Sequence, residues 1–406
     1  MKYSKLIMSK LKKNFIIVMG CTGTGKSDAA IELAKKFNGE VISADSQQIY
    51  KGLDIVTNKV TEDEKKGVKH HLMDFLDPVI RDYNVQAFKD DCYGIMNNLW
   101  DEGKVPIICG GTSYYIESIL FKDNLITTDK EKVKEFREQL KEKSNDELYE
   151  MLLKIDHLSA NQVHRNNRAR VQRALEIALT TGTKKSDIIK EQRKNVKDLI
   201  YDNVLIFNMD ADEKVLDERL DKRIDKMVSR GLKDEIRDFY KKYYDKLGNF
   251  GIMQSIGLKE FKSWFSNETE SNFNEGIKNL QLHTRQYARK QRKWLRQRLM
   301  NRDNNINNIY LMDTTKVEEF YTKNIPIMID IVNDFINDEV YKDVEESPYC
   351  KLWKRSTFTK EDSINIEDVN RLFVCESCSL EIHGIESWKA HLKGKKHKMK
   401  ARQIIN

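Results

Sequence analysis

The chain has 406 residues, of which 39% are hydrophobic and 33% are charged, as is typical of a globular protein and not of a fibrous or disordered one. A chain of this length predicts about two to three domains. No apolar run approaches the roughly 20 residues that a membrane-spanning helix needs, which argues against an integral membrane protein. The net charge of +7 is modest, so the placement of the charges is more informative than their sum.

The first 122 residues alternate between strand and helix patterns. The expected elements are a buried strand at 15–19, an amphipathic helix at 26–37, a strand at 41–44, a helix at 84–102 and a strand that ends at Gly110–Gly111. This alternation predicts a parallel, doubly wound α/β sheet. Because such sheets bind ligands at the carboxyl ends of their strands, we expect the loops after the three strands to face one crevice.

The rest of the chain divides by composition. Residues 123–200 are rich in Lys and Glu with helical periodicity, which predicts an all-helical insertion. A strand at 203–210 and long helices to about residue 300 return to the core, which we expect to comprise 14–122 and 201–337. A linker at 338–366 then precedes a small C-terminal unit at 367–401.

Cysteine usage and the N-terminus bear on location. Six cysteines are scattered, and those outside the C-terminal unit lie in or near apolar segments, which favours a reducing compartment over a secreted disulfide framework. Residues 1–13 carry five lysines and no acid; we interpret them as a solvated basic tail. The alternative is a weak organelle-targeting segment with a second start at Met8. We expect a cytoplasmic protein, and an additional mitochondrial or nuclear pool stays open.

The first chemical motif is a phosphate-binding loop between the first strand and the first helix. Its sequence is GCTGTGKS, formed by Gly20, Cys21, Thr22, Gly23, Thr24, Gly25, Lys26 and Ser27. Backbone amides and the helix N-terminus favour a diphosphate, Lys26 adds a positive charge, and the Ser27 hydroxyl can hold Mg²⁺. The motif does not say what the diphosphate is attached to.

A nucleotide hydrolase also needs an acid at the end of a second apolar strand. The strand that ends at Gly110–Gly111 lacks one, and we expect Asp45, which follows the strand at 41–44, to be the one acid that faces the crevice. Asp45 could serve as a general base, ligate a metal or cap a turn. The machinery for ATP hydrolysis is therefore incomplete.

Arginines mark two further helices. Arg219 and Arg223 share a helical face, where they either form a solvated charged surface or neutralise a departing phosphate. In the helix expected at 276–299, arginines recur at steps of four, three and four residues: Arg285, Arg289, Arg292 and Arg296. Without interleaved acids this stripe indicates binding to a phosphate backbone, and Leu280, Tyr287 and Trp294 are expected to dock the helix.

Seven blocks together resemble a known family. In chain order they are GCTGTGKS, ISADSQQIYKGLDIVTNK, HHLMD, PIICGGTSYY, RVQRALEIALTTG, RIDKMVSRGL and HTRQYARKQRKWLR. These blocks are similar to those of the tRNA dimethylallyltransferases, also called tRNA isopentenyltransferases. The resemblance covers about 285 residues, and the C-terminal unit is similar to that of the eukaryotic branch.

The resemblance implies a P-loop core and a specific reaction. The loop would bind dimethylallyl diphosphate, and the dimethylallyl group would pass to N6 of adenosine 37 beside the tRNA anticodon. Asp45 would be the general base, and Thr22, Lys26 and Arg223, with Mg²⁺ on Ser27 and with Arg219 nearby, would stabilise the leaving diphosphate. The implied tRNA contacts are Asp45, Ser46, Gln47, Gln48, Thr112, Arg170, Val171, Gln172 and Arg173.

The C-terminal unit contains Cys375, Cys378, His391 and His397 in the spacing of a zinc finger. Two thiolates on a hairpin and two imidazoles on a helix predict a closed, structural Zn²⁺ site. Its lysines suit phosphate contact, so we expect the finger to add affinity for tRNA.

Two rival interpretations remain. One is a P-loop kinase of a nucleotide or small metabolite, and the other is an RNA-binding protein whose loop only senses a nucleotide. Cys21 and the pair Gln47–Gln48 are departures from many relatives, and the glutamines leave the contacts to adenine less certain. We expect a monomer.

Overall fold

The computed structural model describes residues 13–122, 125–194, 198–248, 251–300, 306, 308–337, 339, 347–353 and 371–405. The chain forms two compact units, one of residues 1–122 with 198–357 and the other of residues 123–197 with 358–406. Nearly all of the expected basic tail and much of the expected linker lie outside the described residues.

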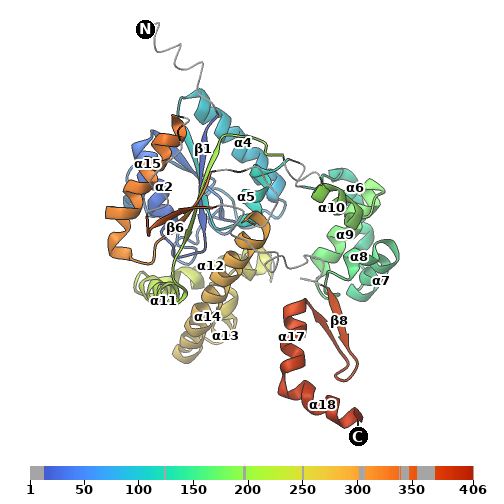
Figure 1. Ribbon diagram of the computed structural model, residues 1–406. Helices are drawn as coiled ribbons and strands as arrows, with labels where there is room; N and C mark the ends of the chain where they lie inside the picture. Colours follow the sequence, from blue (N-terminus) through green and yellow to red (C-terminus); the bar gives the residue numbers. More distant parts are fainter. Residues whose placement is uncertain are drawn as a thin grey trace. The chain divides into compact units, whose positions relative to one another are not determined.

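A mostly parallel sheet forms the centre of the first unit (Figure 1). Among the described residues it has seven strands in the order β3-β2-β4-β1-β5-β6-β7. The strands are β1 (Phe15–Gly20), β2 (Gly39–Ser43), β3 (His70–His71), β4 (Val105–Gly110), β5 (Val204–Asp210), β6 (Ile309–Asp313) and β7 (Cys350–Leu352). Only β7 runs antiparallel to its neighbour. The expectation of an α/β fold is confirmed.

Helices cover both faces of this sheet, which explains why all six residues of β1 are buried apolar residues or glycine (Figure 1). On one face, α2 (Lys26–Lys36) and α15 (Ile325–Ile336) share a core with Ile16, Ile107 and Leu205. On the other face lie α4 (Val85–Asp101) and α5 (Ser113–Leu120). A short helix, α3 (Glu62–Lys65), precedes β3.

A second apolar cluster holds several helices after β5 together. They are α11 (Glu213–Ser229), α12 (Leu232–Leu247), η1 (Gly251–Gln254), η2 (Lys259–Phe261), α13 (Lys262–Ser266) and α14 (Glu270–Trp294). Three short helical segments lie further along the chain, η3 (Leu295–Met300), η4 (Val317–Glu319) and η5 (Phe320–Asn324). The expected long helix is present as α14, but the expected docking seam is only partly correct. Leu280 is buried, whereas Tyr287 is 36% exposed, and the buried face runs through Phe273, Ala288 and Gln291.

The second unit begins with helices that pack on one small core. They are α6 (Lys130–Leu140), α7 (Asn145–Ile155), α8 (His157–Ala160), α9 (Arg168–Thr181) and α10 (Lys185–Lys194). Leu148, Leu152 and Leu175 are fully buried between them. The N-terminus of α7 shows why the helix begins there: the Ser144 hydroxyl accepts the N–H of Glu147, and the Glu147 carboxylate accepts the N–H of Ser144, which forms a capping box.

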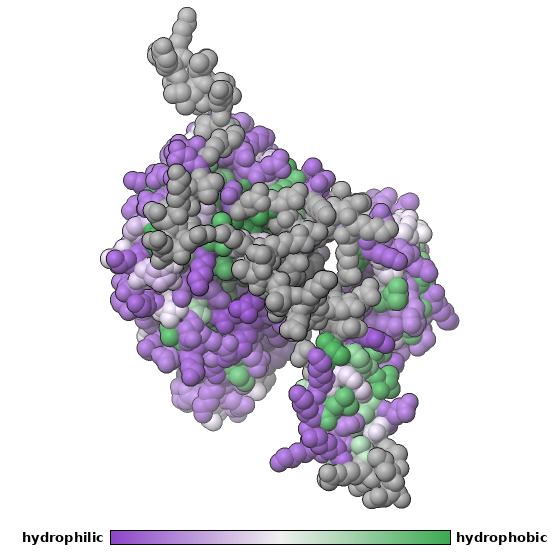
Figure 2. Space-filling model, viewed as in Figure 1, coloured by the Kyte–Doolittle hydropathy of each residue, from purple (hydrophilic) through white to green (hydrophobic). Residues whose placement is uncertain are grey.

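The same unit contains the C-terminal finger, with β8 (Leu372–Cys375), β9 (Leu380–His383), α17 (Ile385–Lys393) and α18 (Lys395–Ile405). Phe373 stacks on Trp388 at 5.3 Å between ring centroids, which gives the finger a small aromatic core. On the face drawn in Figure 2, hydrophilic residues prevail over the described surface. No helix among the described residues has the length and apolar character to cross a bilayer.

Candidate active site and zinc site

A cavity of about 820 Å³ opens in the first unit at the carboxyl ends of β1, β2 and β4. The loops that were expected to share a crevice all contribute to its wall. They supply residues 22–28 after β1, Asp45, Gln47 and Gln48 after β2, and Gly110 and Gly111 at the end of β4. Helix α11 adds Arg219 and Arg223. The structure therefore brings the predicted phosphate loop, the predicted base and the predicted arginines to one place.

The phosphate loop is closed by its own hydrogen bonds. The Thr24 hydroxyl and the Lys26 ammonium both donate to the carbonyl oxygen of Cys21, at 2.9 and 2.7 Å. Gly25 has a φ of 82°, which glycine adopts without strain, and no side chain caps the N-terminus of α2. The first amides of α2 therefore remain available to an anion.

Two cations lie in this cavity with little compensation. Burial lowers the pKa of Lys26, and burial lowers the pKa of Arg223 to about 10, while Asp45 acts in the opposite direction on both. Arg223 donates from Nη1 to the hydroxyl of Thr22 at 3.0 Å, and its buried Nε has no hydrogen-bond partner among the described residues. The cavity wall carries more cations than carboxylates, with Lys26, Arg219, Arg223, Lys259 and Lys290 against Asp28, Asp45 and Glu64, and this excess favours an anionic ligand.

Arg219 has a different neighbourhood. Although it lines the cavity, its Nη2 donates to the carbonyl oxygens of Thr314 and Thr315, at 2.6 and 2.5 Å. These bonds tie α11 to the loop after β6. A contact of Arg219 with the diphosphate stays a prediction.

Asp45 begins a turn and faces the cavity. Its Oδ1 accepts the N–H of Gln47 at 2.9 Å, so the expected turn cap is present, but it uses only one carboxylate oxygen. Next to it, the Thr112 hydroxyl oxygen accepts the N–H of Ser46 at 2.9 Å, which joins the loops after β2 and β4. Asp45 can therefore hold its turn and still present an oxygen to a substrate.

The two glutamines after Asp45 differ in their surroundings. Gln48 donates from Nε2 to the carbonyl oxygens of Thr57 and Asn58, both at 3.1 Å, and so holds its own loop. Gln47 has a buried Oε1 without a hydrogen-bond partner among the described residues, on the wall of the cavity. Of the two, Gln47 has the atom that a bound nucleobase could reach.

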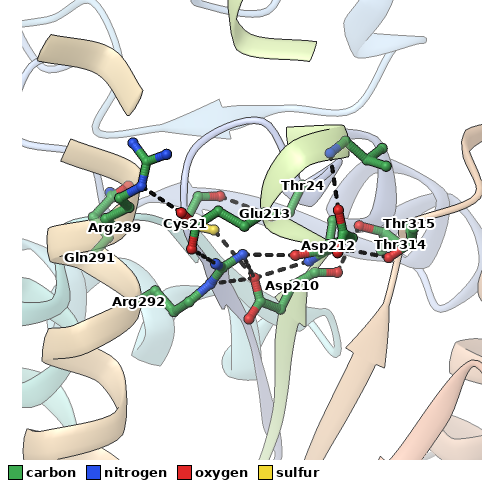
Figure 3. Close-up of polar contacts among 12 residues, drawn as sticks. Cys21, Thr24, Asp210, Asp212, Glu213, Arg289, Gln291, Arg292, Thr314 and Thr315 are labelled. Atoms are coloured by element: carbon green, nitrogen blue, oxygen red, sulfur yellow. Dashed lines mark hydrogen bonds and ion pairs between the residues drawn. The ribbon is translucent and has the colours of Figure 1, made fainter. Parts of the chain in front are cut away.

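The expectation that Asp45 is the one acid that faces the crevice is wrong, because Asp28 and Glu64 also line the cavity. A second apolar strand near the loop also ends in an acid. Strand β5 pairs with β1 and ends in Asp210. Asp210 accepts two N–H groups of Arg292 at 2.7 and 3.0 Å, and its Oδ1 lies 3.6 Å from the sulfur of Cys21 (Figure 3). Burial and Asp210 together raise the pKa of Cys21 to about 11. Asp210 is thus paired with an arginine, and it is not among the residues that line the cavity.

The basic stripe of α14 also needs correction. Arg285 pairs with Asp221, Arg289 with Glu213 and Asp217, and Arg292 with Asp210 and Glu213. Most of these acids belong to α11, and a reading of α14 alone could not reveal them. These three arginines therefore bind acids within the protein. The prediction that they bind phosphates rested on the absence of nearby acids, and the structure shows that such acids are present. Arg296 is exposed, and its contact with tRNA stays a prediction.

The predicted tRNA contacts of the insertion lie at the start of α9. Arg170 is exposed and Gln172 is half-buried, whereas Val171 is fully buried in the helical core, so its side chain cannot reach RNA. Arg173 donates to the Thr128 hydroxyl and to the carbonyl oxygen of Ile126, both at 3.0 Å. Arg170 is the most accessible of these positions.

The finger brings its four predicted ligands together. Their ligand atoms all lie within 4.8 Å of one another: Cys375, Cys378, His391 and His397. The Nδ1 of His397 is 3.4 and 3.6 Å from the two sulfurs, and the buried Nε2 of His391 has no hydrogen-bond partner among the described residues. Two thiols and two imidazoles in this arrangement fit a tetrahedral Zn²⁺ ion.

Removal of zinc is expected to unfold the finger. A ββα unit of this size buries too little apolar surface to fold alone, and binding of structural zinc supplies about 10–16 kcal/mol to such units. With a strong zinc chelator, amide hydrogen exchange in residues 371–405 should rise at least tenfold, while β1 and β5 stay protected. Readdition of Zn²⁺ is the control, and unchanged exchange in the finger would contradict a structural metal.

The fold and the cavity define a class: parallel α/β proteins in which a phosphate-binding loop and a carboxylate line one cavity. Models of known families match in two places, "IPP transferase" at residues 48–298 and "Zinc-finger double-stranded RNA-binding" at residues 372–398. The chain belongs to the IPP transferase family, and the resemblance seen in its sequence is confirmed.

Individual relatives agree with this assignment. The chain is 33% identical to tRNA dimethylallyltransferase of Mus musculus, with 94% of this chain and 84% of the mouse protein covered. It is also 33% identical to tRNA dimethylallyltransferase of Saccharomyces cerevisiae, over 96% of this chain and 92% of the yeast protein. A crystal structure of a eukaryotic dimethylallyltransferase acting on tRNA matches with a TM-score of 0.76 and 30% identity, over 97% of both chains.

Proposed function

We propose that this chain transfers a dimethylallyl group from dimethylallyl diphosphate to N6 of adenosine 37, beside the anticodon of tRNA, and releases diphosphate. Membership of the IPP transferase family supports the reaction. The observation that carries the proposal is the pair of buried cations, Lys26 and Arg223, in one cavity with Asp45. A diphosphate leaving group needs the cations, and an amino nucleophile needs the carboxylate.

In the reaction, N6 of adenine forms a bond to C1 of the dimethylallyl group, and the bond from C1 to the diphosphate oxygen breaks. Negative charge then grows on the leaving diphosphate, and Arg223, Lys26 and the Thr22 hydroxyl stabilise it. Attack makes the N6 proton acidic, and Asp45 accepts it. Since Asp45 uses only one oxygen for its turn, the other is available for this proton.

Magnesium fits the phosphate loop. The Ser27 hydroxyl stands at the position of the loop that holds Mg²⁺ in P-loop proteins, and Mg²⁺ prefers oxygen ligands shared with substrate phosphates. Asp210 is paired with Arg292 and is therefore a poor second ligand. When bound, Mg²⁺ would neutralise charge on the diphosphate.

The partner is the anticodon stem-loop of tRNA. Bases of a single-stranded loop unstack at low cost, so adenosine 37 can enter the cavity. The buried Oε1 of Gln47 offers a hydrogen-bond acceptor to the amino group of the base. On the finger, exposed lysines at 393, 395, 396 and 398 would add contacts to phosphates.

A direct assay tests the proposal. Purified protein is incubated with dimethylallyl diphosphate, Mg²⁺ and unmodified tRNA, and nucleosides are then identified by mass spectrometry. We expect dimethylallyl adenosine at position 37 and one diphosphate released for each adduct. Transfer of label from γ-labelled ATP, without a prenyl adduct, would instead support the kinase.

A further inference from the structure

The side chain of Gln291, which lies outside the phosphate loop, occupies one end of that loop. Gln291 of α14 is only 6% exposed, its Oε1 accepts the N–H of Thr22 at 2.9 Å, and its Nε2 donates to the carbonyl oxygen of Gly111 at 2.9 Å. Only this orientation of the carboxamide satisfies both groups. A Cβ at Gly111 would lie 2.4 Å from Nε2, so a side chain at this position would displace the carboxamide.

The position of Lys26 identifies whether Gln291 lies at the inner or the outer phosphate position of the loop. In a phosphate-binding loop the helix N-terminus holds the inner phosphates and the lysine reaches the outer ones. Here the Lys26 ammonium lies 2.7 Å from the carbonyl oxygen of Cys21. Because Cys21 and Thr22 share a peptide bond, the amide that Gln291 occupies borders the outer phosphate.

A third phosphate would meet unfavourable chemistry at this end. The Thr22 amide, a donor that a phosphate oxygen could use, is already engaged, and the carboxamide oxygen beside it would repel phosphate oxygens. Figure 3 shows the neighbouring residue of the same helix, Arg292, reaching Asp210 at the end of β5. One turn of α14 thus occupies the outer site with Gln291 and holds the end of β5 through Arg292.

We propose that Gln291 is a specificity-determining residue that restricts the phosphate loop to ligands with two phosphates. The inference rests on the diphosphate ligand of the proposed function, and it explains why a P-loop would select a diphosphate over a nucleoside triphosphate. The carboxamide excludes a third phosphate by its bulk, and its hydrogen bonds to Thr22 and Gly111 hold that bulk in position.

The test compares inorganic diphosphate with inorganic tripolyphosphate, which differ by one phosphate and carry no organic group. Titration calorimetry of the full chain with Mg²⁺ gives both dissociation constants. For Gln291→Ala we expect tripolyphosphate to bind about tenfold tighter relative to diphosphate than in the parent protein. Gln291→Met keeps the bulk and should keep the preference for diphosphate. Lys293→Ala, an exposed change on the same helix, is the matched control.

Each outcome bears on the proposal. An unchanged preference in Gln291→Ala, with diphosphate still bound, overturns it. Equal weakening of both ligands in Gln291→Ala and Gln291→Met also overturns it, because Gln291 would then only support the loop. Binding is measured without tRNA or a prenyl group, so a failure of the transferase assay and a failure here are separate results.

Discussion

Replacement of Asp45 by asparagine is expected to lower the turnover number of prenyl transfer by about 10²- to 10⁴-fold, the usual contribution of a positioned general base. Asparagine has nearly the same shape, and its Oδ1 can still accept the N–H of Gln47, so the turn should persist. The amide cannot take the N6 proton. Single-turnover rates with saturating tRNA and dimethylallyl diphosphate measure the change.

Binding of dimethylallyl diphosphate should survive in Asp45→Asn and even tighten, because the carboxylate is a negative charge close to Lys26 and Arg223. Asp77→Asn is a matched control: Asp77 also accepts the N–H of the second residue after it, but it lies outside the cavity wall. A rate within threefold of the parent protein for Asp45→Asn would remove Asp45 as the base.

Structural features formed by residues that are consecutive in the chain could be predicted from the sequence. The strand, loop and helix around Gly20–Ser27 are consecutive, and so are the ligands of each half of the zinc finger. Strand periodicity and glycine placement determine such local structure, and the ends of neighbouring parallel strands must meet at one edge. The cavity with Asp45, Lys26 and Arg223 was therefore predictable in outline.

Features that depend on pairs of distant residues were missed. Asp210 closes an apolar strand, yet its sequence does not reveal that the strand lies beside β1 or that Arg292, 82 residues later, neutralises it. Strand β7 lies within the expected linker, and its three residues are too few to show a period. The contact of Gln291 with the phosphate loop was missed for the same reason, because a single buried glutamine on a charged helix gives no sequence pattern.

Replacement of Arg223 by glutamine is expected to reduce kcat/KM for dimethylallyl diphosphate by about 10²- to 10³-fold, since this guanidinium faces the charge that develops on the leaving group. Its charge is costly in the free protein, because burial lowers its pKa to about 10. A cation whose pKa falls on folding destabilises the folded state at all pH values at which it is protonated, which includes neutral pH.

The same substitution should therefore raise the melting temperature of the ligand-free protein while it lowers activity, as expected where a functional group is held at a cost in stability. Arg230→Gln, an exposed change at the C-terminal end of α11, is the matched control and should alter neither quantity. Thermal unfolding with and without diphosphate separates the effects: the parent protein should gain more from the ligand than Arg223→Gln. If Arg223→Gln instead loses stability and activity together, Arg223 has a structural role, and the leaving group must depend on Lys26 and the loop amides alone.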